Sequence, residues 1–339
     1  MNVTSEGDIG DIIYLCGILS EIGGKHNLLL HTSQVTSLRD IEAVKRVHAL
    51  LEPLLAKQPY INEFRIFEAG DKIDWSSGGF RAGGFHFHET SLFRAHLNHL
   101  KSMTGIGDSI KGKNKWIHLD EQEKNDQLIV INLTHRYRNP YFPWKEIVDH
   151  YRDRLVFIGL PHEHRDFINS YGDVEYRETK DFLEIAKLID ESALFIGNQS
   201  SAFAVCEGLK HDCIQETSLF IPDCIWKRPN AQHVFDGECV LPDIYGSGEL
   251  RLESKVKEVF SRKTHITPPG GWKFRGISTT AFGPMVNAVK LNYGAEFPDD
   301  KSAEDAILEE QFKRLPDFFR DDSTRHLFDI VKRTYANAD

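Results

Sequence analysis

The first part of the chain alternates short apolar runs with longer amphipathic stretches. Leu28-Leu29-Leu30 is an apolar run of strand length, whereas residues 12–22 and 38–57 carry apolar side chains at helical spacing. We predict further strands at residues 2–4 and 64–67. A β-α-β-α-β order is typical of a parallel sheet covered by helices.

The same order begins again after a less regular region, which includes a glycine-rich loop at residues 78–84 and a predicted helix at 91–103. We find no repeat of the sequence itself, so only the architecture is repeated. In the second half we predict strands at 128–133, 155–158, 174–176, 194–196 and 213–215, and helices at 144–151, 162–170, 181–190 and 200–209.

These patterns predict an α/β protein with two Rossmann-like domains that face each other across a cleft. We expect an N-terminal domain at residues 1–125 and a C-terminal domain at 126–275. Residues 276–339 are expected to be helical, with amphipathic patterns at 303–315 and 324–335 and with packing against the first domain as one option.

Composition and charge narrow the class of protein. A length of 339 residues suits two domains, and no apolar run approaches the roughly 20 residues that a membrane-spanning helix needs. The net charge of -10 disfavours a general nucleic-acid-binding surface. The N-terminus lacks the pattern of a secretory signal, and the five cysteines show no CxxC spacing, so we expect reduced thiols and a cytoplasmic location.

Ligands of open α/β sheets bind beyond the carboxyl ends of the strands. The first loop of interest there is Ser5–Asp11, in which Asp11 or Asp8 could act as a general base for a hydroxyl, with Gly10 allowing close approach. The alternative is an ordinary helix start, with Asp11 as the N-cap or a first-turn acid.

Two loops of the second half carry groups suited to a diphosphate. Arginine side chains bind phosphate oxygens in a fork, and a helix N-terminus attracts anions. A carboxylate two turns into the second helix, Glu207, could accept the ribose hydroxyls of a nucleotide. The alternatives are a solvated basic loop, ordinary N-capping and a surface glutamate. The donor-binding candidates are Thr134, Arg136, Arg138, Asn198, Gln199, Ser200, Ser201 and Glu207.

Histidine pairs raise the question of a metal site. His86 and His88, like His162 and His164, have the i, i+2 spacing of a strand, but neither pair has a third ligand at a diagnostic distance. We therefore predict no metal site. His86, together with Arg81, remains a candidate for contact with an acceptor.

Residues 4–13, with the pair Gly10-Asp11 before an apolar helix, resemble the opening of the ADP-heptose:lipopolysaccharide heptosyltransferases, a group in glycosyltransferase family 9 with the GT-B fold. Residues 195–209 resemble the donor-binding turn and helix of that group, although Asn198-Gln199-Ser200-Ser201 replaces the usual Asp-(Ser/Thr)-Gly. The resemblance implies that Asp11 is the catalytic base and that residues 134–138 contact the diphosphate.

The resemblance implies a glycosyltransferase that moves a sugar from a nucleotide-diphosphate sugar to an acceptor hydroxyl, with inversion and without a metal ion. The nucleotide-sugar would be a co-substrate, and no cofactor is expected. The acceptor could be a glycan, a lipid-linked glycan or, against the acidic charge, a modified DNA base. A nucleotide-sugar epimerase and a non-catalytic binding protein of the same fold are the alternatives.

Overall fold

The computed structural model describes residues 1–33, 36–81, 91–139, 142–218, 224–226, 228–234, 238–241 and 250–253. Over these residues the protein is a mixed α/β structure built on two parallel sheets. The expected helices at 303–315 and 324–335, the whole of 276–339 and His86 lie outside the described residues.

The first sheet, here called sheet A, has four parallel strands in the order β3-β2-β1-β4. Strand β1 pairs with β2 on one side and with β4 on the other. The order in which the chain adds strands to the sheet therefore reverses between β1 and β4. The strands are β1 (Asn2–Ser5), β2 (His26–Leu30), β3 (Ile61–Ile66) and β4 (Trp75–Ser76).

Side-chain caps set the helix boundaries in this half. Asp40 accepts a hydrogen bond from the Ala43 N–H, so the second helix begins at Ile41 and not at the predicted residue 38. Ser91 caps the next helix in the same way, and Gly105 ends it in a left-handed conformation with φ of 72°. The helices are α1 (Ile9–Ile22), α2 (Ile41–Leu55), the 3₁₀ helix η1 (Ser77–Arg81) and α3 (Leu92–Thr104).

The second sheet, sheet B, has six parallel strands in the order β10-β9-β8-β5-β6-β7. This is the Rossmann order, in which the chain reverses its direction of travel between β5 and β8. The strands are β5 (Asn125–Asn132), β6 (Leu155–Phe157), β7 (Glu175–Tyr176), β8 (Ser192–Asn198), β9 (Cys213–Glu216) and β10 (Ala231–Val234).

The helices of the second half agree with the sequence pattern to within two residues. Asp181 and Ser200 cap the last two of them through side-chain oxygens. The elements are α4 (Trp144–Tyr151), η2 (Arg152–Arg154), α5 (Pro161–Tyr171), α6 (Phe182–Glu191) and α7 (Ser201–Leu209), followed by an antiparallel pair, β11 (Glu238–Leu241) and β12 (Leu250–Glu253).

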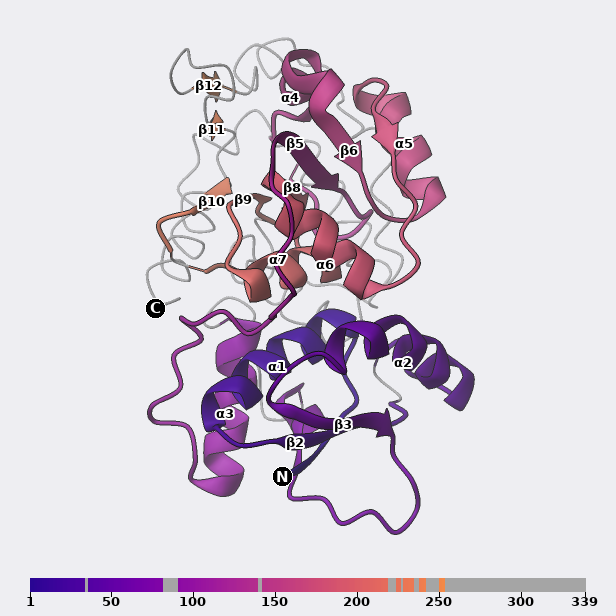
Figure 1. Ribbon diagram of the computed structural model, residues 1–339, viewed down its shortest axis with the longest axis vertical. Coiled ribbons are helices and arrows are strands. Elements are labelled where there is room, and N and C mark those ends of the chain that lie inside the picture. The colour runs from indigo at the N-terminus through magenta and orange to yellow at the C-terminus, as the bar shows by residue number, and fades with distance from the viewer. Residues whose placement is uncertain are drawn as a thin grey trace, which may run out of the picture.

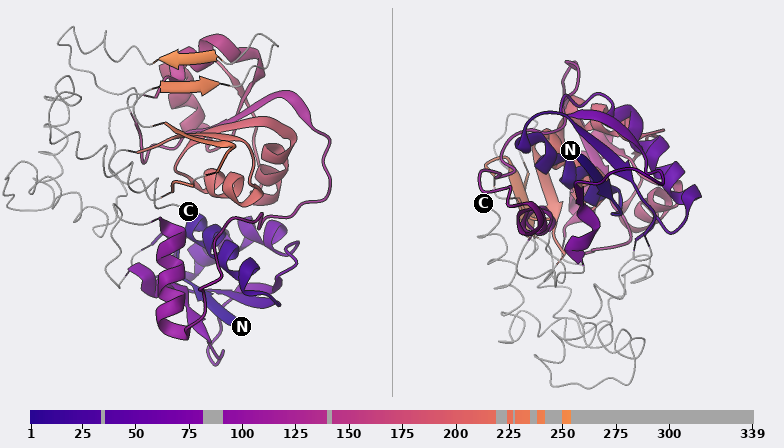
Figure 2. Two further views of the ribbon diagram at one scale, coloured as in Figure 1. Left: turned by 90° about the vertical axis from the view of Figure 1, so that its left-hand side faces the viewer. Right: turned by 90° about the horizontal axis from the view of Figure 1, so that it is seen from below.

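The two sheets lie one above the other with helices between them (Figures 1 and 2). Helix α1 packs on α7 and α2 packs on α6, so the helices between the sheets share one hydrophobic core. A second core lies on the opposite face of sheet B, beneath α4 and α5. No helix of the described residues is long and apolar enough to cross a membrane.

Candidate functional site at the carboxyl ends of the two sheets

The two loops predicted to bind a diphosphate lie together in sheet B. One follows β5 and the other follows β8, and these strands are neighbours at the point where the strand order reverses. In sheets of this kind the crevice for a ligand opens outside the carboxyl ends of these two strands. The topology alone therefore brings Thr134 and Ser200 to the same edge.

Asn198, the last residue of β8, fastens the loop that follows β5. Its side-chain oxygen accepts a hydrogen bond from the Thr134 N–H at 3.0 Å. Its amide nitrogen donates to the carbonyl oxygens of Thr134 at 3.0 Å and Arg136 at 2.6 Å. Asn198 is fully buried, so its side chain serves as the internal hydrogen-bonding partner of this loop.

Glu216, at the end of β9, holds the other end of the same loop. Its buried carboxylate accepts hydrogen bonds from Arg138 Nε at 2.9 Å and from Trp144 Nε1 at 2.6 Å. The Asn139 N–H donates to it as well. Burial opposes the charge of Arg138, but the Glu216 carboxylate and the Tyr171 hydroxyl together outweigh burial and raise the pKa of that guanidinium. The Arg138 side chain therefore stabilises the conformation of the loop.

Arg136 differs from Arg138 in its surroundings. Its side chain is exposed, and within the described residues its guanidinium contacts only the ring of Tyr137, at 5.4 Å. Tyr137 has a φ of 55°, a left-handed conformation that a non-glycine residue adopts infrequently and that fits a tight turn. Of the two predicted arginines, Arg136 is therefore the one available to a ligand.

The start of α7 adjoins this loop. Ser200 caps the helix by accepting from the Phe203 N–H at 3.2 Å, and its own hydroxyl donates to Asn132 Oδ1 at 2.8 Å. The cap satisfies only one of the orphan N–H groups of the first turn. Gln199 is buried and Ser201 is partly exposed at the same helix end.

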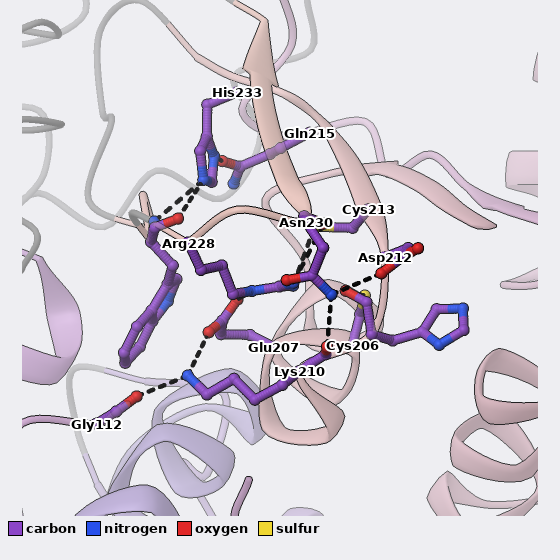
Figure 3. A network of polar contacts seen from close by, with 12 residues as sticks. Gly112, Cys206, Glu207, Lys210, Asp212, Cys213, Gln215, Arg228, Asn230 and His233 are labelled. Carbon is purple, nitrogen blue, oxygen red and sulfur yellow. Dashed lines mark hydrogen bonds and ion pairs between the residues drawn. The ribbon is translucent and has the colours of Figure 1, made fainter. Parts of the chain in front are cut away.

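Glu207 lies in the middle of α7 in a buried ionic network (Figure 3). One carboxylate oxygen accepts from Lys210 Nζ and the other from Arg228 Nε, at 2.6 and 2.9 Å. Lys210 Nζ also donates to the Gly112 carbonyl oxygen. Glu207 is fully buried and both its oxygens are occupied, so the structure does not present it at the carboxyl ends of the strands.

The Lys210 ammonium lies over the rings of Trp116 and Trp226, with its nitrogen 4.4 and 4.5 Å from their centroids. Burial lowers the pKa of Lys210, and the Glu207 carboxylate partly restores it. Trp226 also stacks on Tyr14 of α1. The network therefore joins the end of α7 to the first half of the chain.

The end of α1 meets the same connecting segment as the end of α7. Glu21 of α1 accepts from the Lys111 N–H, and Gly17 lies directly against the Trp116 ring. From α7, the Gly208 carbonyl oxygen accepts from the N–H groups of Trp116 and Ile117. Residues 111–117 therefore contact the carboxyl ends of both helices.

At the carboxyl edge of sheet A, Asp8 and Asp11 form the start of α1. Asp8 is the N-cap residue, and Asp11 Oδ2 accepts from the Asp8 N–H at 3.0 Å, which completes a capping box. Asp8 Oδ1 also accepts from the Ser37 N–H. Asp11 is buried and is therefore a first-turn acid of the helix, with Asp8 in the capping position.

Two polar residues at this edge were missed by the sequence analysis. Glu6 is half-buried and lies against Gly78, and Ser77 is buried at the end of β4. Glu6 closely follows the predicted first strand, which was a signal that could have singled it out, whereas Ser77 follows β4, which the sequence pattern did not predict. Of the other predicted residues, Gly10 lies in the first turn of α1 and Arg81 ends η1, its side chain being outside the described part.

The described residues contain no group of three or more His, Cys, Asp or Glu side chains arranged to hold a metal ion. The four cysteines whose side chains are described, Cys16, Cys206, Cys213 and Cys224, are buried.

No family model and no curated protein matches the chain by sequence. By structure it is similar to E. coli heptosyltransferase WaaC with ADP-2-deoxy-2-fluoro heptose, at 12% identity over 78% of this chain and 100% of that chain, with a TM-score of 0.40. It is similar to a glycosyl transferase of family 9 from Veillonella parvula, at 12% identity over 91% of this chain and 97% of the other, with a TM-score of 0.45.

A further similarity is to the iron-containing heptosyltransferase TibC of enterotoxigenic E. coli in complex with ADP-D-beta-D-heptose. There the identity is 15% over 68% of this chain and 62% of the other, and the TM-score is 0.43. The resemblance that the sequence analysis named is to the same group of proteins.

Proposed function

We propose that this protein is a GT-B glycosyltransferase that moves a sugar from a nucleotide-diphosphate sugar to an acceptor hydroxyl, without a metal ion and with inversion. The observation that carries the proposal is the edge of sheet B, where Asn198 fixes the backbone of the Thr134–Arg136 loop. This loop and the start of α7 follow the two neighbouring strands beyond whose carboxyl ends such sheets bind a ligand.

The chemistry of that edge suits a diphosphate. The exposed guanidinium of Arg136, the hydroxyl of Thr134 and the N–H groups at the start of α7 are donors to anionic oxygens. Fixed donors of this kind stabilise charge that develops on a leaving diphosphate. Because Arg138 and Glu207 are fully engaged in buried ion pairs, we assign neither of them to the donor in this arrangement.

The base is proposed to be Asp11, as the family resemblance implies. Its carboxylate takes the proton of the acceptor hydroxyl, whose oxygen bonds to the anomeric carbon as the bond to the diphosphate breaks. The nucleoside diphosphate leaves with the electron pair. Attack on the face opposite to the leaving group inverts the anomeric configuration.

The contacts of α1 and α7 support a common site for base and donor. Gly17 and Gly208 both contact Trp116, while Glu21 and Lys210 contact the neighbouring residues 111 and 112. Residues 111–117 thus join α1, whose first turn carries Asp11, to α7, whose first turn carries Ser201. A GT-B cleft requires these two first turns to lie on the same side.

Nucleotide binding is the direct test. We expect one of ADP, UDP, GDP or CDP, or its sugar, to raise the melting temperature, because a ligand at 100 times its dissociation constant stabilises a fold by about 2.7 kcal/mol. Arg136→Ala should weaken that ligand roughly tenfold or more, as expected for a charged hydrogen bond of about 1.5–3 kcal/mol. Arg46→Ala, at an exposed position of α2, is the matched control.

The reaction class is tested with the nucleotide-sugar that binds. Transfer requires an acceptor, so incubation of the protein with the nucleotide-sugar alone should leave the configuration of the sugar unchanged in proton NMR spectra. Conversion to an epimer would contradict the proposal. So would the failure of every nucleoside diphosphate and every nucleotide-sugar to bind.

A further inference from the structure

We propose that Glu6 and Ser77 form the acceptor subsite, and that they select a neutral, polyhydroxylated acceptor, that is, a carbohydrate. This inference rests on the proposed glycosyl transfer and names the class of its second substrate. It follows from polar groups at the edge of sheet A that lack partners in a protein where nearly all buried polar groups are expected to be paired.

The location is set by topology. Sheet A reverses its strand order between β1 and β4, so its ligand crevice is expected outside the carboxyl ends of these two strands. Thr4 pairs with Ser76 in the parallel register, and the next residues along the two strands are Ser5 and Ser77. Glu6 and Ser77 therefore lie directly at that position.

The acids of the loop that follows β1 differ in what they already bind. Asp11 accepts the Asp8 N–H in the capping box of α1, and Asp8 accepts the Ser37 N–H. The Glu6 carboxylate, in contrast, has no hydrogen bond or ion pair within the described residues. Because it is half-buried yet unpaired, it retains its full capacity to accept hydrogen bonds from a ligand.

Ser77 supplies the second, independent observation. Ser77 is 1% exposed, and its hydroxyl has no hydrogen-bond partner in the described part of the chain. Leaving a buried hydroxyl unpaired costs about 1–3 kcal/mol, so its presence calls for an explanation. The next residue is Gly78, and a Cβ there would lie 2.9 Å from Glu6 Oε2, so the carboxylate lies directly beside the residue that follows Ser77.

A carboxylate and a hydroxyl at the same sheet edge offer acceptors and one donor to a ligand. Sugar hydroxyls, which both donate and accept, match this set. An anionic acceptor would face the charge of Glu6 together with those of Asp8 and Asp11, and like charges at this distance repel. With Asp11 as the base for the attacked hydroxyl, Glu6 and Ser77 would hold a second hydroxyl of the same acceptor.

The test uses saturation-transfer NMR on the full chain, with glucose, galactose, N-acetylglucosamine and lactose as neutral probes and glucose 6-phosphate as the anionic match of glucose. We expect at least one of the neutral sugars to bind. If glucose binds, we expect it to bind more tightly than glucose 6-phosphate. Glu6→Gln and Ser77→Ala should each weaken this binding at least fivefold. Glu52→Gln and Ser109→Ala, at exposed positions elsewhere, should not.

Stability separates a binding role from a structural one. Neither Glu6→Gln nor Ser77→Ala should lower the melting temperature, because neither side chain has a hydrogen-bonding partner to lose among the residues that the structure describes. Loss of stability, unchanged sugar binding in both variants, binding of none of the neutral sugars, or preference for glucose 6-phosphate over glucose would each overturn the inference.

The nucleotide experiment distinguishes this inference from the proposed function. The Glu6 and Ser77 variants should bind nucleoside diphosphate as the unaltered protein does, since the donor groups belong to sheet B. If sugars bind as expected but no nucleotide does, glycosyl transfer is wrong and the carbohydrate site stands. If nucleotides bind but the sugar results fail, only the acceptor assignment falls.

Discussion

At the carboxyl edge of sheet B, the side chains of Asn198 and Glu216 each make several hydrogen bonds to the loop after β5, whereas at the edge of sheet A the side chains of Glu6 and Ser77 make none within the described part of the chain. Both edges occupy the same topological position in their sheets. The edge of sheet B is therefore held in place by its own hydrogen bonds, whereas the edge of sheet A has polar side chains that can bind a ligand.

This difference suits two kinds of recognition. A diphosphate carries its charge on a few oxygens and is bound best by donors that are already held in place. An acceptor hydroxyl must be able to enter and leave, and groups that pair with it cannot be paired elsewhere in the fold. Unpaired polar groups cost stability, so an edge that keeps them is expected to be the less stabilising of the two.

The largest expected effect is on the edge of sheet B. Glu216→Ala removes the partner of a buried guanidinium and should lower the free energy of unfolding by about 3–5 kcal/mol. Glu6→Ala, at the corresponding edge of sheet A, should change it by less than about 0.5 kcal/mol. Urea denaturation of the two variants measures both values, and equal losses would remove the distinction between the edges.

A pH titration gives the next effect. Burial lowers the pKa of His233, which lies in β10 beside Gln215, to about 4. The unfolded chain, with a histidine pKa of about 6.5, therefore binds the proton that the folded protein does not. Stability should fall by about 3 kcal/mol on this account as the pH drops from about 6.5 to 4.

The contribution of His233 is isolated by substitution, because His211 has a pKa lowered in the same way. His233→Gln should reduce the slope of the unfolding free energy against pH in this window. His150→Gln, at an exposed position on α4, should leave the slope as it is. An unchanged slope in the His233 variant would show that this side chain is not the buried neutral base assigned here.

A smaller effect is expected for Asn198→Ala. The variant leaves the Thr134 N–H and the carbonyl oxygens of Thr134 and Arg136 without their partner, at a cost of about 2 kcal/mol. Nucleoside diphosphate binding should be lost with the shape of the loop. Asn62→Ala removes an exposed side-chain hydrogen bond in sheet A and should cost less than about 0.5 kcal/mol.

Local patterns were enough to predict most of the architecture. Local patterns predicted five of the six strands of sheet B and missed β10, and Ser200 was placed correctly at a helix start because a serine before an apolar helix is a recurrent cap. The rule for parallel sheets then brought the Thr134 and Asn198 loops to one edge. The two-residue strand β4 was missed because it is too short to show any period.

The partners of charged residues could not be predicted in this way. Arg138 pairs with Glu216 across 78 positions, and Glu207 pairs with Arg228 across 21, so neither contact leaves a local signature. The sequence therefore suggested Arg138 and Glu207 as ligand-binding groups when both serve the fold. The acids Glu6, Asp8 and Asp11 look alike in the sequence. The three-dimensional path of the backbone determines that Asp8 and Asp11 cap α1 and that the Glu6 side chain does not.

The smallest expected change in stability tests the open edge most closely. In Gly78→Ala the new methyl group meets the end of the flexible Glu6 side chain, which can move aside, so the loss should stay below about 1 kcal/mol. Displacing the carboxylate should nevertheless weaken sugar binding and leave nucleoside diphosphate binding unaltered. If the effect acts through Glu6, Gly78→Ala should have no further effect on sugar binding in a Glu6→Gln background. Additive losses in the double variant would mean that the glycine acts on the ligand by a different contact, and that the closeness of Glu6 to Gly78 is not what shapes this edge.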